Sequence, residues 1–236
     1  MPILSAFGAS RTIPGASGIV GGEYSYDFNG SSYFTYPAST SFAIGTQTFS
    51  IECFVYLNSY PSITAAILDF GFSTGSTNQR IQFYIDSSGR PVFVRNNFPG
   101  GIQTLTSSIS VSLSTWTYIA VSRYSSALGS IRVFVDSSIG ASGTITGSMS
   151  NYSTVTPSVG NGTVQTLRFL DGKISNLRFN LGSSFSTATI PTQPLTAVAT
   201  TKMLTCQSST VKDKSVANGG GPWTLTNSGV LVSTSS

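Results

Sequence analysis

Carboxylates are the side chains in this chain that could hydrolyse a glycosidic bond, a reaction that needs an acid and a nucleophile about 5 Å apart. The chain has 8 acidic residues, of which only Glu23 and Glu52 are glutamates. Asp27 is the only acid near Glu23 in the sequence, and Glu52 has no acid within three residues. The chain has no histidine, which excludes the usual general base and the usual catalytic triads. A Lys or Ser nucleophile stays open, but no motif marks one, so we predict that the protein is not an enzyme.

The aspartates could instead bind a metal ion, because calcium takes carboxylate and carbonyl ligands from loops. They stand singly rather than in an Asp-x-Asp cluster, as Asp69, Asp86, Asp136, Asp171 and Asp213. An aspartate beside Gly or Ser more often caps a turn. We therefore predict no metal and no other cofactor. If calcium does bind, Asp136 and Asp171 are the first pair to consider.

Charge limits the possible partners. The net charge of +4 comes from 12 basic and 8 acidic residues, and these are scattered singly. The densest cluster, Lys212-Asp-Lys214, is interrupted by an acid, so no basic run could follow a phosphate backbone. No apolar stretch approaches the ~20 residues that span a bilayer, and the N-terminus has no basic and apolar export signal. We expect a soluble protein that binds neither nucleic acid nor membrane.

The two cysteines, Cys53 and Cys206, lie far apart in the sequence. Cys53 shares a face with Phe49, Ile51 and Val55, which favours a buried thiol that packs like a small apolar side chain. A disulfide to Cys206 is the alternative, since the first and last strands of a sandwich often meet and spacing alone does not decide the geometry.

The stretch 116–136 is the strongest structural signal. Its two runs, 116–123 and 131–136, are rich in β-branched and aromatic residues and are joined by a polar break, which predicts a hairpin. In the second run Ile131, Val133 and Val135 share one face. The first run is apolar on both faces, so it should lie deep in a sheet that is covered on both sides. We expect this hairpin at the centre of a sandwich.

Other strand patterns are separated by turn-forming residues. They cover 24–28, 33–36, 49–57, 81–86, 91–95, 158–160, 167–179, 202–206 and 223–226. The order Asp86-Ser-Ser-Gly89 suits a type I turn and predicts a second hairpin, and a tight turn at residues 29–31 predicts a third. No segment has an amphipathic helical repeat, so helix should be confined to about one turn near Phe185. The predicted class is all-β and antiparallel.

Residues 1–22 have a different composition, dominated by Gly, Ala, Ser and Pro without periodicity. Such a segment loses much entropy on ordering and buries little apolar area, which predicts a flexible arm in front of one domain at residues 23–236. Four apolar side chains could order the arm on a partner surface, namely Ile3, Leu4, Phe7 and Ile13. A frayed terminus is the alternative.

Several motifs in order resemble the concanavalin A-like lectin/glucanase superfamily, and within it the laminin-G-like jelly roll. The similarity covers roughly residues 22–210, through Phe28-Asn-Gly-Ser-Ser-Tyr33, Phe49-Ser-Ile-Glu-Cys-Phe-Val55, Trp116-Thr-Tyr-Ile-Ala-Val-Ser-Arg123, Ile131-Arg-Val-Phe-Val-Asp136, Ser158-Val-Gly160 and Phe169-Leu-Asp-Gly-Lys-Ile-Ser-Asn-Leu-Arg178. The resemblance implies a jelly-roll sandwich of two curved antiparallel sheets. Glu52 stands where glycosidases of the superfamily often have a glutamate, but the companion carboxylates are missing.

The fold that this resemblance implies makes glycan binding a natural function. Aromatic rings stack on sugar faces, while Asn, Ser and Arg bind hydroxyls. Loops are the usual place for such groups, and the candidates are Tyr60, Phe72, Arg95, Asn96, Asn97 and Phe98.

The segment 191–208 and the Gly/Ala/Ser-rich opening also resemble lectin-like domains of bacteriophage structural proteins. This resemblance implies a virion protein, and we expect a capsid decoration or cement protein whose arm attaches it to other virion proteins. Homo-oligomers are common in such positions, and a trimer would suit a capsid site. The alternative is a tail-fibre or adhesin domain that binds polysaccharide on the host surface.

Overall fold

The computed structural model describes residues 24–71, 79–97, 101–145, 147–149, 156–162, 168–216 and 220–234. The predicted arm, with Ile3, Leu4, Phe7 and Ile13, lies outside the described residues, as do the glycan candidates Phe72 and Phe98. No helix in the described part of the chain is long and apolar enough to cross a membrane.

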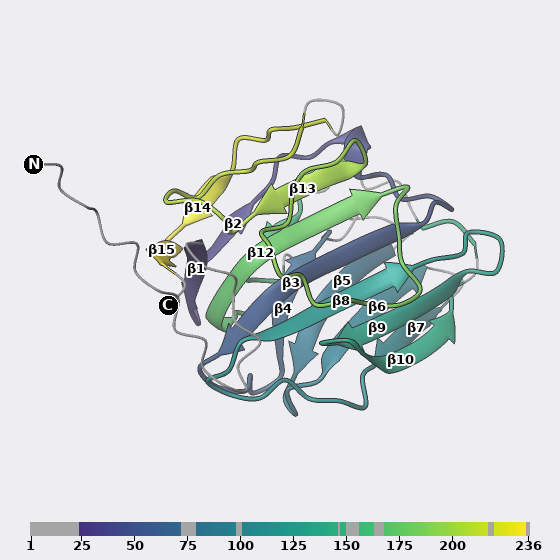
Figure 1. The fold of residues 1–236 in the computed structure, drawn as a ribbon, viewed down its shortest axis with the longest axis horizontal. Coiled ribbons are helices and arrows are strands. Elements are labelled where there is room, and N and C mark those ends of the chain that lie inside the picture. The colour runs from purple at the N-terminus through teal and green to yellow at the C-terminus, as the bar shows by residue number, and fades with distance from the viewer. Residues whose placement is uncertain are drawn as a thin grey trace, which may run out of the picture.

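Two antiparallel sheets lie face to face (Figure 1), which confirms the predicted all-β jelly-roll sandwich. The 8-stranded sheet A has the order β10 (Ser138–Thr144), β9 (Ser130–Val135), β8 (Thr117–Arg123), β3 (Phe49–Leu57), β12 (Asp171–Leu181), β1 (Tyr24–Asn29) and β15 (Leu231–Thr234), and β13 (Thr201–Thr205) also pairs with β12. The 7-stranded sheet B has the order β14 (Thr226–Ser228), β2 (Tyr33–Thr35), β11 (Ser158–Val159), β4 (Thr64–Asp69), β5 (Gln79–Asp86), β6 (Pro91–Asn97) and β7 (Ile102–Thr106).

The core between the sheets follows from alternation along each strand. On β5, Ile81, Phe83 and Ile85 are fully buried and share the face that contacts sheet A. Residues 49, 51, 53 and 55 of β3 do the same from the opposite sheet. Each such side chain contributes roughly 1.5–3 kcal/mol by leaving water, so the period-2 patterns favour the packing of the two sheets on each other.

A second apolar cluster covers the outer face of sheet A. Phe54, Tyr118 and Phe134 point outward from β3, β8 and β9, yet they are buried because the segment 182–200 crosses over them. Phe185 from that segment packs on Phe134, with ring centroids 5.6 Å apart. This cover explains why every residue of β8 is buried, as its apolar run predicted.

A buried ion pair fastens the same segment. Glu52 accepts two hydrogen bonds from Arg178, at 3.0 Å from Nε and 2.8 Å from Nη2, and a third from the Tyr118 hydroxyl at 2.7 Å. Arg178 also donates to the carbonyl of Thr196 at 2.9 Å. The network links three strands of sheet A to the crossing segment.

Some strand predictions are wrong in position. The hairpin of β8 and β9 exists, but it lies beside the centre of sheet A, which is formed by β3 and β12. The turn after Asn29 does not return the chain in the same sheet, because β1 pairs with β12 and β15 while β2 pairs with β11 and β14.

Other boundaries also differ. No strand was expected between residues 136 and 158, but β10 lies there, and the expected strand 223–226 is replaced by β14 and β15 further on. The one short helix in the described chain is the 3-10 turn η1 (Thr40–Phe42), not a turn near Phe185.

Both cysteines carry free thiols and are fully buried. Cys53 lies on β3 and Cys206 directly follows β13, so β12 separates them within sheet A. Burial raises the pKa of both thiols well above the ordinary value. The packing role favoured for Cys53 is confirmed, and the alternative disulfide is not formed.

Candidate functional site

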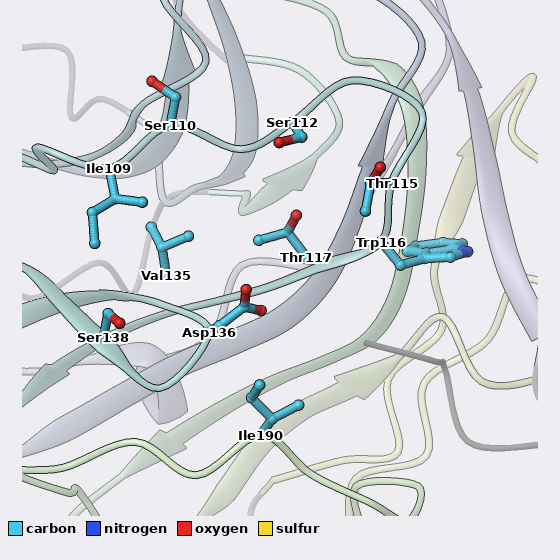
Figure 2. Close-up of a pocket in the computed structure, with 10 residues that line it drawn as sticks. All are labelled: Ile109, Ser110, Ser112, Thr115, Trp116, Thr117, Val135, Asp136, Ser138 and Ile190. Atoms are coloured by element: carbon cyan, nitrogen blue, oxygen red, sulfur yellow. The ribbon is translucent and has the colours of Figure 1, made fainter. Parts of the chain in front are cut away.

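A pocket of about 510 Å³ opens at one end of the sandwich, near the turn between β9 and β10. Such a volume lies within the ~300–1,000 Å³ of small-ligand sites. Its walls come from the loop between β7 and β8, the first residues of β8, the β9–β10 turn and the crossing segment (Figure 2). The lining residues are Ile109, Ser110, Ser112, Thr115, Trp116, Thr117, Val135, Asp136, Ser138 and Ile190.

The loop wall is tied to the ends of neighbouring strands. The amide of Val111 donates to the carbonyl of Gly89 at 2.8 Å, and the Tyr60 hydroxyl donates to the carbonyl of Val111 at 3.0 Å. Further along, the amide of Ser114 donates to the carbonyl of Leu57 at 2.9 Å. Two segments, the end of β3 with the residues after it and the β5–β6 turn, therefore fix the loop before any ligand arrives.

A close contact with β10 positions the start of the same loop. A Cβ added to Gly140 on β10 would lie 2.1 Å from the Ser107 hydroxyl, so only glycine fits there. The amide of Ser108 donates to the carbonyl of Gly140 at 2.9 Å. The loop is thus held against β10 as well as against the ends of β3 and β5.

Asp136 is the charged residue of the pocket. It stands in a two-residue turn with φ of 53°, a conformation that Asp tolerates better than most residues. Its Oδ1 accepts from the amide of Tyr118 at 3.1 Å, and its own amide donates to the Tyr118 carbonyl at 2.7 Å. Oδ2 has no hydrogen-bond partner among the described residues, so it is available to a ligand.

The other lining groups are hydroxyls and apolar side chains. Figure 2 shows the Asp136 carboxylate between Thr117 and Ile190, with Ser112 on the loop above and the indole of Trp116 pointing away from it. Trp116 packs on Tyr56, with ring centroids 5.5 Å apart. The arrangement suits a ligand with hydroxyl groups on one side and C–H groups on the other, because both kinds of surface meet matching partners.

Tyr60, a predicted glycan residue, supports the pocket without lining it. Besides its hydrogen bond to Val111, its ring lies so close to Gly89 that an added Cβ would be 2.4 Å from the ring edge. The residue is 40% exposed. Tyr60 therefore stabilises the loop wall of the pocket.

The loop placement expected for Arg95, Asn96 and Asn97 is wrong, because β6 continues to Asn97. Arg95 is only 3% exposed and donates to Gln103 at 2.9 Å and to the carbonyl of Ser148 at 2.6 Å, so it does not face a surface ligand. These three residues occupy the end of β6 opposite to the β5–β6 turn against which Tyr60 packs. The sequence candidates therefore do not form one site, and binding by Asn96 or Asn97 stays a prediction.

Asp136 and Asp171 do not form a joint metal site. Strands β8 and β3 lie between β9, which Asp136 follows, and β12, which Asp171 begins. Three strand spacings of about 4.8 Å place the two backbones about 14 Å apart, too far for one ion. Asp171 instead accepts from Asn58 at 3.0 Å and from Ser59 at 2.6 Å. The part of the chain that the structure describes contains no group of three or more Cys, Asp or Glu that could hold a metal ion.

Sequence reasoning missed most of the pocket, including Trp116 as a wall and the whole loop 107–115. The alternation of Ser with Ile, Val and Leu in that loop resembles a strand pattern and hides its role. A usable signal was the position of Asp136 directly after a strongly patterned strand, since side chains that follow strands gather at sheet ends.

Solved structures share this fold at low sequence identity. A candidate carbohydrate-binding protein from Bacteroides ovatus has a TM-score of 0.63 and 14% identity, over 90% of this chain and 60% of that one. Domain 4 of the extracellular arabinanase of Geobacillus stearothermophilus, in complex with arabinotriose, has a TM-score of 0.53 and 16% identity, over 67% of this chain and 71% of that one.

The carbohydrate-binding module of a Ruminococcus gnavus sialidase, bound to α2,3-sialyllactose, has a TM-score of 0.52 and 15% identity, over 69% of this chain and 93% of that one. No curated protein matches the chain. Residues 28–181 match the family model of the concanavalin A-like lectin/glucanases superfamily. The chain therefore belongs to this superfamily, as its motif order predicted.

Proposed function

We propose that this domain binds carbohydrate in the pocket that Asp136 lines. The observation that carries the proposal is the second oxygen of the Asp136 carboxylate, which has no hydrogen-bond partner in the described part of the chain. It faces hydroxyls and apolar side chains across a pocket whose loop wall is fixed by neighbouring segments. Sugars present hydroxyls and C–H faces together, and preorganised polar groups bind them without a large ordering cost. The similar structures in complex with arabinotriose and sialyllactose support a sugar ligand on this fold.

The proposal is tested by titrating the domain with a panel of oligosaccharides in a calorimeter. For the best ligand, Asp136→Asn should weaken binding about tenfold, because a hydrogen bond to a charged group contributes about 1.5–3 kcal/mol. Asp27→Asn is the matched control, because Asp27 lies on β1, whose neighbours β12 and β15 contribute no residue to the pocket, and it should leave affinity unchanged. Absence of binding to every glycan, or equal losses in both variants, would count against the pocket.

We also propose that the protein binds its ligand without reacting with it. Glu52, which stands where glycosidases of the superfamily often have a glutamate, is 3% exposed and accepts hydrogen bonds from Arg178 and Tyr118. Asp136 has no second carboxylate among the residues that line the pocket. Incubation of a bound oligosaccharide with the protein should give no shorter products by chromatography, and sustained product formation would refute this part.

The setting that we propose is the bacteriophage virion, on the resemblance of residues 191–208 and of the opening segment to lectin-like phage domains. A sugar pocket favours the tail-fibre or adhesin alternative over the capsid decoration protein, because decoration needs only an attachment surface. Deletion of residues 2–20 should abolish incorporation into particles and leave the domain folded, while glycan binding should persist. Normal incorporation would contradict attachment through the arm, and analytical ultracentrifugation would test the expected oligomer.

A further inference from the structure

We infer that the pocket selects neutral glycans over acidic ones, an inference that rests on the proposed carbohydrate binding. Asp136 is the only charged residue among the ten that line the pocket. Its Oδ1 is partly satisfied by the amide of Tyr118, and Oδ2 is left for a ligand. A carboxylate accepts hydrogen bonds and cannot donate them, so the groups that it recognises are donors such as sugar hydroxyls.

Two arginines on elements that form or fix the pocket have other partners. Arg90 follows Gly89, whose carbonyl accepts the hydrogen bond from the loop wall, and it forms an ion pair with Asp86 at 2.8 Å. Arg132 on β9 donates to the carbonyl of Ser186 and lies over the ring of Tyr124, 4.9 Å from its centroid. Neither arginine lines the pocket. Among the residues that line the pocket, a uronate or sialate carboxylate would therefore meet a like charge and no arginine or lysine.

The fold alone does not decide this selectivity. Similar structures are in complex with arabinotriose, a neutral sugar, and with sialyllactose, whose sialic acid carries a carboxylate. Both ligand classes are thus compatible with the scaffold, and the charge of the individual pocket must select between them. Like charges brought together at an interface oppose binding, and more strongly when salt is low.

The turn geometry makes Asp136→Asn a clean test variant. Asn tolerates positive φ as Asp does, and its amide oxygen can replace Oδ1 as the acceptor for Tyr118. The variant removes the charge and keeps the shape. Its effect on acidic ligands can then be separated from any effect on folding, which circular dichroism checks.

The experiment titrates matched neutral and acidic pairs, lactose with sialyllactose and oligogalactose with oligogalacturonate, against the full chain and Asp136→Asn. The full chain should bind the acidic sugar of each pair at least tenfold more weakly than the neutral one, a difference of about 1.4 kcal/mol. The ratio of the neutral to the acidic affinity should grow at low salt. In Asp136→Asn this ratio of affinities should fall towards one, because the neutral sugar loses affinity and the acidic sugar does not.

The outcomes separate the two proposals. If no sugar of either kind binds, the proposed carbohydrate binding fails. If sugars bind but the acidic member binds as tightly as the neutral one, or if the ratio is the same in Asp136→Asn, binding stands and the charge selection is overturned. A salt-independent ratio would likewise overturn it, because charge repulsion must be screened.

Discussion

The buried pair of Glu52 and Arg178 provides the sharpest test of how the outer face of sheet A is held. The side chain of Glu52 is 4% exposed and that of Arg178 is 18% exposed. Replacing Glu52 with Met removes two hydrogen bonds from Arg178 and leaves the hydroxyl of the fully buried Tyr118 without its acceptor. Breaking a buried pair costs about 3–5 kcal/mol. Because Arg178 can partly reach water and keeps Thr196, we expect the lower end, about 3 kcal/mol.

For a chain of this length 1 kcal/mol shifts the melting temperature by roughly 2–4 °C, so Glu52→Met should lower it by roughly 6–12 °C. Calorimetry on Glu52→Met, Arg178→Met and the double variant forms a double-mutant cycle. The double variant should be more stable than the sum of the single losses predicts, because two apolar side chains replace the pair without leaving a buried charge. Single shifts below about 2 °C, or losses that simply add, would refute a coupled buried pair.

Three further predictions follow from single groups. Cys53 and Cys206 should not react with a thiol reagent in the native protein and should both react in denaturant, because burial raises the pKa of each thiol; rapid native labelling would contradict their burial. Burial alone would raise the pKa of Asp86, but hydrogen bonds from Arg90 and Ser88 outweigh it and lower that pKa. Asp86→Asn should therefore lower the free energy of unfolding near neutral pH. The difference from the parent protein, measured by urea unfolding, should shrink as the pH falls below about 4, because the parent loses the same contribution when Asp86 is protonated. A difference that stays constant with pH would contradict this. Gly140→Ala should lower stability by about 1–3 kcal/mol and weaken glycan binding, since its Cβ would displace Ser107 and the loop wall; unchanged affinity by calorimetry would argue against that wall.

Strand patterns that depend on neighbours in the sequence were predictable. The alternation in β3 and β5 places an apolar side chain on the core face at every second residue, and that face is the same in any sandwich. The turn after Asp86 was predictable for the same reason, because its geometry is set by four consecutive residues.

Contacts between distant segments were not predictable in this way. β10, with the sequence Ser-Ile-Gly-Ala-Ser-Gly-Thr, has weak strand propensity and forms because it pairs with β9. The turn at Asn29 is local, but the sheet that receives β2 is decided by β11 and β14, more than 100 residues later. Arg95 was expected in a loop as a group that binds sugar hydroxyls, whereas it is buried and donates to the Ser148 carbonyl and to Gln103.

The residues of the pocket also divide into those that could be predicted from the sequence and those that could not. Asp136 could be chosen from the sequence because it directly follows a clear strand, although a metal ion was the role considered for it. The loop 107–115 could not, because its position is fixed by Leu57, Gly89 and Gly140, which belong to three other parts of the chain. Ile190 reaches the pocket only because the crossing segment lies over sheet A.

The most direct test of the account is the location of a bound sugar by nuclear magnetic resonance. Titration of the isotope-labelled protein with a neutral oligosaccharide should shift the amide signals of Ser112, Thr117 and Asp136 and leave those of Asn96 and its neighbours on β6 unchanged. Shifts that gather at the far end of β6, or no shifts at any sugar concentration, would contradict a glycan site in this pocket.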